Sequence, residues 1–435
     1  MADRVDTKHP EYDSLKQQRD IYRRVLSGVK ALVDNAEEDL PQLPAESDAS
    51  WKDRCKTATL RNYLKKALKA MTGMVFAGEI NIEALNARLK VLCENIDKEG
   101  NHLNVFAREV YESRHDGYAA VLADKPSQTA RTRREERGLD LNPFLRLYNA
   151  DSIWNWRYRT NTTSQAVELS MVVLREETLA PDGKYGHQVE VRYREFWLDG
   201  NNVKVQVWLQ RDDDKEPLIE VPEQTLKLSA IPVEIFGTLG ELPPLLDVAM
   251  LNREHFQTYS IYKSDAHKTC VPQRVIEGGT ADSIPPIGGD ITLCPPQSTS
   301  GAFGKAYFIE VAGSSLTVVR QILLDIKEDI AGLTNSVVSG KSTGPKVTAT
   351  AEIIDNTQET AELRPMAEEF KDSLERCFGF LGEWIGLGED QAGSIVLQTQ
   401  WAMAEIKAEE NADRQARSEE ANIAAIAAKA GQTNG

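Results

Sequence analysis

The chain has 435 residues, 41% of them hydrophobic, and 51 Lys and Arg against 67 Asp and Glu give it a net charge of −16. This length allows two or three domains or one large elongated subunit with a sizeable core. So acidic a chain is not expected to present a generally nucleic-acid-binding surface, because such surfaces are basic. No apolar run approaches the roughly eighteen residues of a membrane span, and the charged N-terminus shows no secretory signal.

The five cysteines are dispersed and form no CxxC pair. This pattern favours reduced thiols in a cytosolic setting over a disulfide framework or a zinc site. The sequence predicts no catalytic residue, no metal site and no cofactor. The cysteines are Cys55, Cys93, Cys270, Cys294 and Cys377.

Helices are expected over 10–40, Thr57–Phe76 and 80–123, where apolar residues recur at helical spacing. An acidic, Pro-containing loop is expected over 35–50. Two basic groups stand out, and each is expected to form a solvated face. The second group could also contact nucleic acid or an acidic neighbouring subunit. The groups are Arg19, Arg23 and Arg24, then Arg61, Lys65, Lys66 and Lys69.

His115 stands beside Asp116, which is a pair used in catalysis. Since no nucleophile motif lies near it, we expect a structural or surface role. Residues 125–142 are polar and Arg-rich and are expected to form an exposed loop.

From Asn142 the pattern changes to alternating β-type runs, with a hairpin turn signal at Asp199-Gly200-Asn201-Asn202. Trp154 and Trp156 could form a stacking platform for single-stranded nucleic acid. Few basic residues flank them, so packing in the core of an antiparallel sheet is favoured.

Two helices are expected at about 243–267 and 315–338, on either side of an insert rich in Pro, Gly, Ser and Thr. Two ordinary packed helices of a globular domain would give the same periodicity. Loop-rich inserts of this length are often functional. The second helix is expected to carry one apolar stripe, opposite the acidic residues Asp325, Glu328 and Asp329. The stripe comprises Val319, Ile322, Leu323, Ile326, Ile330, Leu333 and Val337.

The loop 339–346 contains Gly340-Lys341-Ser342, which is similar to the end of a phosphate-binding loop. The full motif requires Gly where Asn335 stands and a strand where a helix is expected, so nucleotide binding is disfavoured. The alternative is a flexible surface loop.

A long acidic helix is expected from Thr348 to about Ile385, kinked at Pro365. Its carboxylates could suggest acid/base or metal chemistry, but no His accompanies them, so an acidic stripe is favoured. A short strand over 394–400 and an Ala-rich helix from Trp401 are expected to follow. The carboxylates are Glu352, Asp355, Glu359, Glu362, Glu368, Glu369, Asp372 and Glu375.

This order of elements resembles the core of tailed-phage portal proteins, the head-to-tail connector rings. The resemblance is carried by PPLLDVAMLN, VPQRVIEGG, FIEVAGSSL and ATAEIIDNTQETAELRPMAEEF. The N-terminal HPEYDSLKQQRDIYRRVLSGVKAL is similar to the opening of one portal subfamily, so the resemblance covers roughly Pro10 to Trp384.

The resemblance implies an α+β portal-type subunit divided into named parts. These are an α/β wing (1–240), a stem helix (241–267), a β-containing clip (268–314), a second stem helix (315–338), a tunnel loop (339–346), a long kinked wing helix (347–389) and a helical crown (390–435). Lys341 and Lys346 would contact DNA phosphates without sequence specificity. The acidic residues Asp325, Glu328 and Asp329 would line the channel, where an acidic wall repels phosphates and lets DNA slide.

The implied function is non-enzymatic. A ring, a dodecamer in virions, would pass double-stranded DNA during packaging and ejection at one capsid vertex. The implied partners are terminase, capsid and scaffold proteins and neck or adaptor proteins, with no membrane. The chain would act in the host cytoplasm during assembly and then in the virion. The alternatives are an unrecognised enzyme using the acidic residues of 348–385, or another ring-forming head or neck protein.

Overall fold

The structure is a computed structural model that describes residues 4–44, 46–126, 141–161, 165–211, 216–269, 273–277, 305–309, 314–334, 363–388 and 392–404. Helices and strands both contribute, which confirms a mixed α+β class. The chain divides into two compact units, which we describe separately. Unit 1 is Met1–Arg23, Lys65–Asp247 and Asn335–Gly435, and unit 2 is Arg24–Leu64 and Val248–Thr334. The boundaries of the wing, stem, clip and crown remain predictions.

A three-stranded antiparallel sheet lies at the centre of unit 1. Its middle strand is β2 (Tyr118–Asp124), flanked by β3 (Phe144–Asn149) and β9 (Val233–Gly237). The expected helix over 80–123 is therefore wrong at both ends, since β1 (Asn81–Glu83) is also a strand. Helix α7 (Leu103–Arg114) stops, and Gly117, at φ 111°, turns the chain into β2. Tyr118–Ala123 is apolar at every position because both faces of β2 are buried, and such a run lacks the alternation that usually marks a strand.

One face of this sheet is covered by α7 and α12 (Leu363–Trp384). Phe370 of α12 lies at the centre of an aromatic group. Its ring centroid is 5.6 Å from that of Phe76, 5.4 Å from Tyr111 and 5.1 Å from Phe236. These rings join segments far apart in the sequence into one core.

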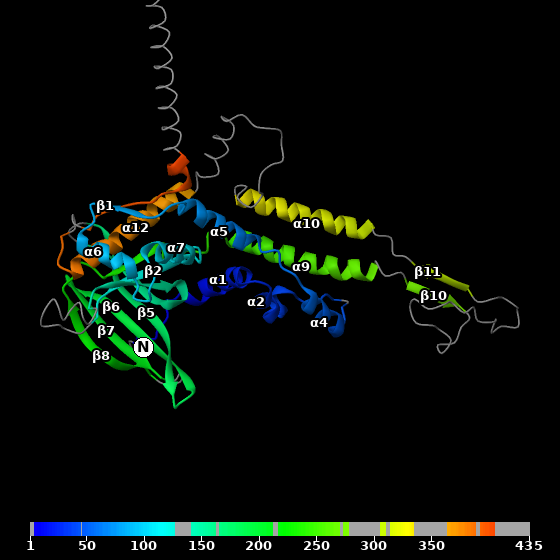
Figure 1. The fold of residues 1–435 in the computed structure, drawn as a ribbon. Coiled ribbons are helices and arrows are strands. Elements are labelled where there is room, and N and C mark those ends of the chain that lie inside the picture. The colour runs from blue at the N-terminus through cyan, green and yellow to red at the C-terminus, as the bar shows by residue number, and fades with distance from the viewer. Residues whose placement is uncertain are drawn as a thin grey trace, which may run out of the picture. The chain divides into compact units, whose positions relative to one another are not determined.

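The other face of β2 packs in a second core, which it shares with a five-stranded antiparallel sheet. The strands of this sheet follow one another in chain order and lie side by side (Figure 1). The predicted hairpin is confirmed, since Asp199 pairs with Asn202 and Gly200 has φ 64°. Trp156 is 6% exposed and lies in this core, as predicted. The strands are β4 (Ile153–Thr160), β5 (Val167–Asp182), β6 (Gly186–Asp199), β7 (Asn202–Gln210) and β8 (Leu218–Leu226).

Shorter elements complete unit 1. β1 (Asn81–Glu83) pairs antiparallel with β12 (Ser394–Val396), which confirms a strand near 394. Helix α6 (Ala87–Leu92) buries Leu89 and Leu92 in the first core. The chain passes between the units within α1 (Tyr12–Ser27), α5 (Tyr63–Val75) and α9 (Leu246–Thr269).

Unit 2 is mainly helical. The expected loop over 35–50 is partly wrong, because α3 (Ala36–Asp39) and the start of α4 (Asp48–Thr57) fall within it. Ser47 caps α4 by accepting a hydrogen bond from the Ser50 amide, which satisfies one free N–H of the first turn. The other elements are α2 (Val29–Asp34), β10 (Gln273–Glu277), β11 (Lys305–Ile309) and α10 (Ser314–Leu333).

Candidate functional site

The helix–insert–helix order that dominates the sequence is present in unit 2. Helix α9 leads to β10, β11 leads to α10, and the two strands pair antiparallel from Gln273 opposite Ile309 to Glu277 opposite Lys305. Both expected helices are confirmed, the second as far as Leu333. The remaining residues of the insert, including Cys270 and Cys294, lie outside the described residues.

Helix α9 is fixed to residues 39–64 by polar contacts. The fully buried Asn252 accepts a hydrogen bond from the Leu64 amide (3.1 Å) and donates one to the Arg61 carbonyl (2.9 Å). One turn further on, Gln257 donates to the Asp39 carbonyl (3.1 Å). These bonds satisfy backbone groups where α5 begins, so they hold α9 in one register against this segment.

A row of aromatic rings runs along α9. The His255 ring meets the edge of Tyr63 at 5.2 Å and stacks on Tyr259 at 5.9 Å, and Tyr259 stacks on Tyr262. Burial, with the positive charge of Arg61 nearby, lowers the pKa of His255 to about 4. The imidazole is therefore neutral at physiological pH, and it serves to pack the helix.

Helix α10 does not have the single apolar stripe expected from the sequence. Leu323, Ile326 and Ile330 are buried, whereas Ile322 and Leu333 are 42% and 48% exposed. The helix therefore buries one apolar stripe and leaves other apolar side chains exposed, among them Val318 and Leu324. Val337 lies outside the described residues.

The acidic residues of α10 are all exposed, and the Asp325 carboxylate accepts a hydrogen bond from the Gln321 side chain (2.7 Å). Exposure is necessary for the predicted channel-lining role of Asp325, Glu328 and Asp329. A single chain does not test that role, because a channel would be formed only by several copies.

Four further predicted features fall wholly or partly outside the described residues. Lys341 and Lys346 lie in 335–362, outside the described residues, and so does the part of the expected acidic helix that precedes Leu363. Pro365 is the third residue of α12, in its first turn, so the kink remains a prediction. Most of the Arg-rich loop over 125–142 is likewise outside the described part of the chain.

The α12 carboxylates that can be described form structural contacts. Glu369 pairs with Arg114 at 2.5 Å, and the Glu375 carboxylate accepts the Ile395 amide at 2.7 Å. Each contact ties α12 to a neighbouring segment of unit 1.

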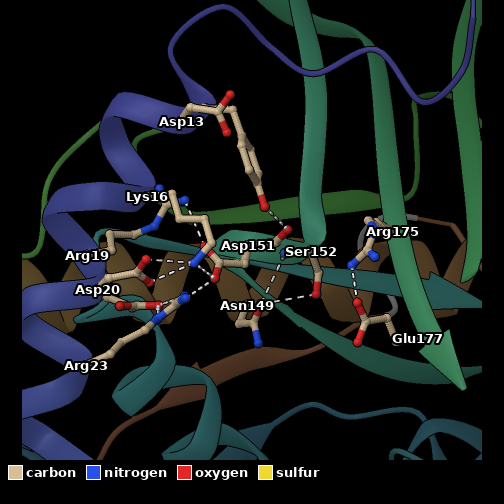
Figure 2. A network of polar contacts seen from close by, with 12 residues as sticks. Asp13, Lys16, Arg19, Asp20, Arg23, Asn149, Asp151, Ser152, Arg175 and Glu177 are labelled. Carbon is tan, nitrogen blue, oxygen red and sulfur yellow. Dashed lines mark hydrogen bonds and ion pairs between the residues drawn. The ribbon is translucent and has the colours of Figure 1, made fainter. Parts of the chain in front are cut away.

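A network of polar contacts joins α1 to the central sheet of unit 1 (Figure 2). The Asp151 carboxylate, just after β3, pairs with Arg19 at 3.0 Å and with Arg23. Arg23 also donates to Asp116 (2.7 Å through Nε), and Arg19 donates to the Tyr118 hydroxyl (3.0 Å). The network thus joins three segments of unit 1 that are far apart in the sequence.

The solvated face expected for these arginines is wrong. The Arg19 side chain is 0% exposed, and Arg23 and Arg24 are 26% and 16% exposed. In unit 2, Arg24 pairs with the fully buried Asp39 at 2.6 Å. The burial of Arg19 could have been predicted from the sequence. Leu15, Arg19 and Tyr22 are separated by four and three residues, so Arg19 lies on the same helical face as two apolar residues.

The protonation of this network follows from burial and charge. Burial alone would raise the pKa of Asp151, but the charge and hydrogen bonds of Arg23 outweigh it and hold that pKa below its ordinary value. Burial raises the pKa of Asp116 to about 6, although Arg23 acts in the opposite direction. His115 is buried beside it, donates a hydrogen bond from Nδ1 to the Tyr111 carbonyl (2.9 Å), and has its pKa lowered by burial to about 4. Both His115 and Asp116 are therefore buried side chains held by contacts within unit 1.

A hollow of about 840 Å³ lies between α4 and the C-terminal half of α9. Tyr262, Lys263 and His267 line one side, and Lys56 and Thr57 line the other. Lys263 donates to the Thr57 carbonyl and to the Thr59 hydroxyl, both at 2.8 Å, so part of its hydrogen-bonding capacity is used within the chain.

Two kinds of feature are absent from the described ranges. No three His, Cys, Asp or Glu side chains there are grouped so that they could hold a metal ion. None of the helices that the structure describes is both long and apolar enough to cross a membrane.

Comparison with known proteins gives one partial match. Residues 244–385, about a third of the chain, match the model of a domain of unknown function, DUF4055, an uncharacterised family associated with phages. No curated protein matches the chain. The matched range begins just before α9 and ends just after α12, so it contains the helix–ribbon–helix of unit 2 and is similar to that domain.

Proposed function

We propose that this protein is a phage portal subunit, one copy of a ring through which double-stranded DNA enters and leaves the capsid. The observation that carries the proposal is the helix–ribbon–helix of α9, β10, β11 and α10, within a range that resembles a phage-associated domain. In the proposal, α9 and α10 form the stem of the ring. The insert between them docks terminase and later the neck proteins.

The charge of α10 supports the same proposal. Three exposed carboxylates within five residues create a negative surface. A channel wall of this sign repels phosphate and prevents DNA from binding tightly while it moves. The lysines Lys341 and Lys346 would then supply weak, salt-dependent contacts.

The first test is the mass of the purified protein by light scattering, with negatively stained images of the same peak. A portal ring should have a mass of about 580 kDa, twelve times the 48.5 kDa of one chain, and a central hole. A compact dimer without a hole, with or without added scaffold protein, would refute the proposal and favour an enzyme.

A second test addresses the loop. Lys341→Glu combined with Lys346→Glu should reduce DNA packaging without preventing ring formation, because only the phosphate contacts change sign. Normal packaging by this variant would show that the loop lysines do not guide DNA.

A further inference from the structure

The ribbon of unit 2 consists of β10 and β11 alone in the part of the chain that the structure describes (Figure 1). The two strands pair antiparallel in one continuous register, from Gln273 opposite Ile309 to Glu277 opposite Lys305. A sheet of only two strands is marginally stable in water, because each strand has backbone hydrogen-bonding groups on its outer side that the sheet does not satisfy. The ribbon would therefore gain stability from a further strand on either edge.

The edges of the ribbon differ from those of the five-stranded sheet in unit 1. In that sheet, the edge strand β8 contains Pro222 and has register shifts against β7, and both features discourage pairing with another strand. At the opposite edge, the carbonyl of Trp154 in β4 already accepts a hydrogen bond from the His9 amide (3.0 Å). Neither β10 nor β11 contains Pro or Gly, and five of their ten residues are β-branched or aromatic. The ribbon is therefore better suited to edge-to-edge pairing than the larger sheet.

The charge of the ribbon indicates which partner it fits. Copies of a chain of net charge −16 repel each other, so a contact between copies has to be locally neutral or of opposite sign. In the ribbon, Arg274 and Lys305 outnumber the single acidic residue Glu277, which gives a net charge of +1. Glu277 is opposite Lys305 within the ribbon, so the same register between copies would also place Glu277 of one copy opposite Lys305 of the next. A second copy of this chain is therefore a partner of matching charge.

We propose that β11 of one copy pairs antiparallel with β10 of a second copy, so that the ribbons of neighbouring copies join into one sheet. Copies in a ring are related by rotation, so β10 of the neighbour runs in the same direction as β10 of the first chain and opposite to its β11. A complete ring then closes the sheet with two strands from each copy and leaves no edge unpaired. The contact involves only β10 and β11, so it leaves the carboxylates of α10 exposed, as the proposed channel requires. The inference rests on the proposed portal function and identifies a contact that would hold the ring together.

Disulfide formation between different copies tests the pairing. Rings assembled from a mixture of Glu277→Cys and Lys305→Cys chains should give covalent dimers on mild oxidation. The reason is that directly opposite residues of antiparallel strands have Cα atoms about 5 Å apart, which a disulfide can bridge. Each variant assembled alone should give no dimer, because one strand separates its new cysteines, which are then about 10 Å apart.

Gln273→Cys mixed with Lys305→Cys is the matched control. Gln273 and Glu277 lie at opposite ends of β10, so in the proposed register Gln273 is about 13 Å along the strand from the position opposite Lys305, and this mixture should not cross-link. All variants carry Ser in place of Cys55, Cys270 and Cys294, and the remaining two cysteines are buried. Circular dichroism of each variant checks folding.

The outcomes separate the inference from the proposed function. Rings that form but give no dimer in the mixture of Glu277→Cys and Lys305→Cys would overturn the inference and leave the portal proposal standing. Dimers in the control mixture instead would indicate parallel neighbouring strands and also overturn it. Equal yields of dimer from assembled rings and from subunits dissociated before oxidation would show random collision, with the same consequence. Wild-type protein that forms no ring would refute the portal proposal itself.

Discussion

Replacing Asp151 with Ala should destabilise unit 1 strongly. This carboxylate is the shared partner of Arg19 and Arg23, and Lys16 approaches it at 3.5 Å. Without it, Arg19 keeps its hydrogen bond to the Tyr118 hydroxyl, which carries no compensating charge. A guanidinium that is 0% exposed would then be left without its ion-pair partner.

The magnitude follows from burial. Removing one partner of a fully buried ion pair costs about 3–5 kcal/mol, because the remaining charge stays desolvated. Asp151 itself is 24% exposed, so water can enter the vacated site and relieve part of this cost. We therefore expect a loss of about 3 kcal/mol. Adding Arg19→Met should recover part of it, since the stranded charge is then gone.

Urea unfolding followed by tryptophan fluorescence would measure this loss, because Trp154 and Trp156 lie in unit 1 close to α1. Protein concentration must be held constant, since assembly adds stability. Asp34→Ala is the matched control, because Asp34 pairs with Lys30 at the surface, where the two side chains are 57% and 88% exposed. This substitution should change the free energy of unfolding by no more than about 0.5 kcal/mol. An Asp151→Ala variant as stable as the control would refute the reasoning.

Three further predictions concern packing, backbone and protonation. Phe370→Ala should cost about 4 kcal/mol in urea unfolding, because it empties the centre of an aromatic core; a loss below about 1 kcal/mol would contradict that. Gly117→Ala should lower the melting temperature by more than Gly183→Ala. Both glycines have positive φ, but only at Gly117 would a Cβ meet a carbonyl, that of Glu241 at 2.6 Å; equal losses would count against this steric reason. The pKa of His255 is near 4 in the folded protein and near 6.5 in the unfolded chain. Between pH 4 and 6.5 the imidazole therefore binds a proton only in the unfolded state. Stability should therefore fall on acidification from pH 6.5 to 4 by up to about 3 kcal/mol relative to His255→Phe, and parallel pH profiles of the two proteins would exclude the effect.

Local rules explain which elements the sequence predicts well. The hairpin at Asp199–Asn202 follows from a turn that requires Gly at positive φ, and α9 begins where Pro243 and Pro244 end an irregular segment. These features depend on neighbours a few residues away. They can therefore be predicted from the local sequence, without knowledge of the tertiary structure.

Tertiary context explains the failures. Tyr118–Ala123 is a strand because a hydrophobic core forms on each of its two faces. An Ala-rich run does not by itself predict burial on both faces. Arg19 and Arg23 are buried because Asp116 and Asp151 are brought to them from about a hundred residues away, or more. Helical spacing marks the face of Arg19, but only the fold supplies its partner.

Helix α10 shows how the two levels combine. The periodicity of its sequence predicts which residues are apolar and on which side of the helix they lie. It does not predict which of these apolar residues are buried within the chain and which are exposed. The structure separates them: Leu323, Ile326 and Ile330 are used within the chain, and Val318, Ile322 and Leu333 are left over. An apolar surplus interleaved with Asp325 and Asp329 is costly in an isolated subunit. Covering this surface with another helix would lower that cost, and the periodicity of one helix does not identify which helix that is.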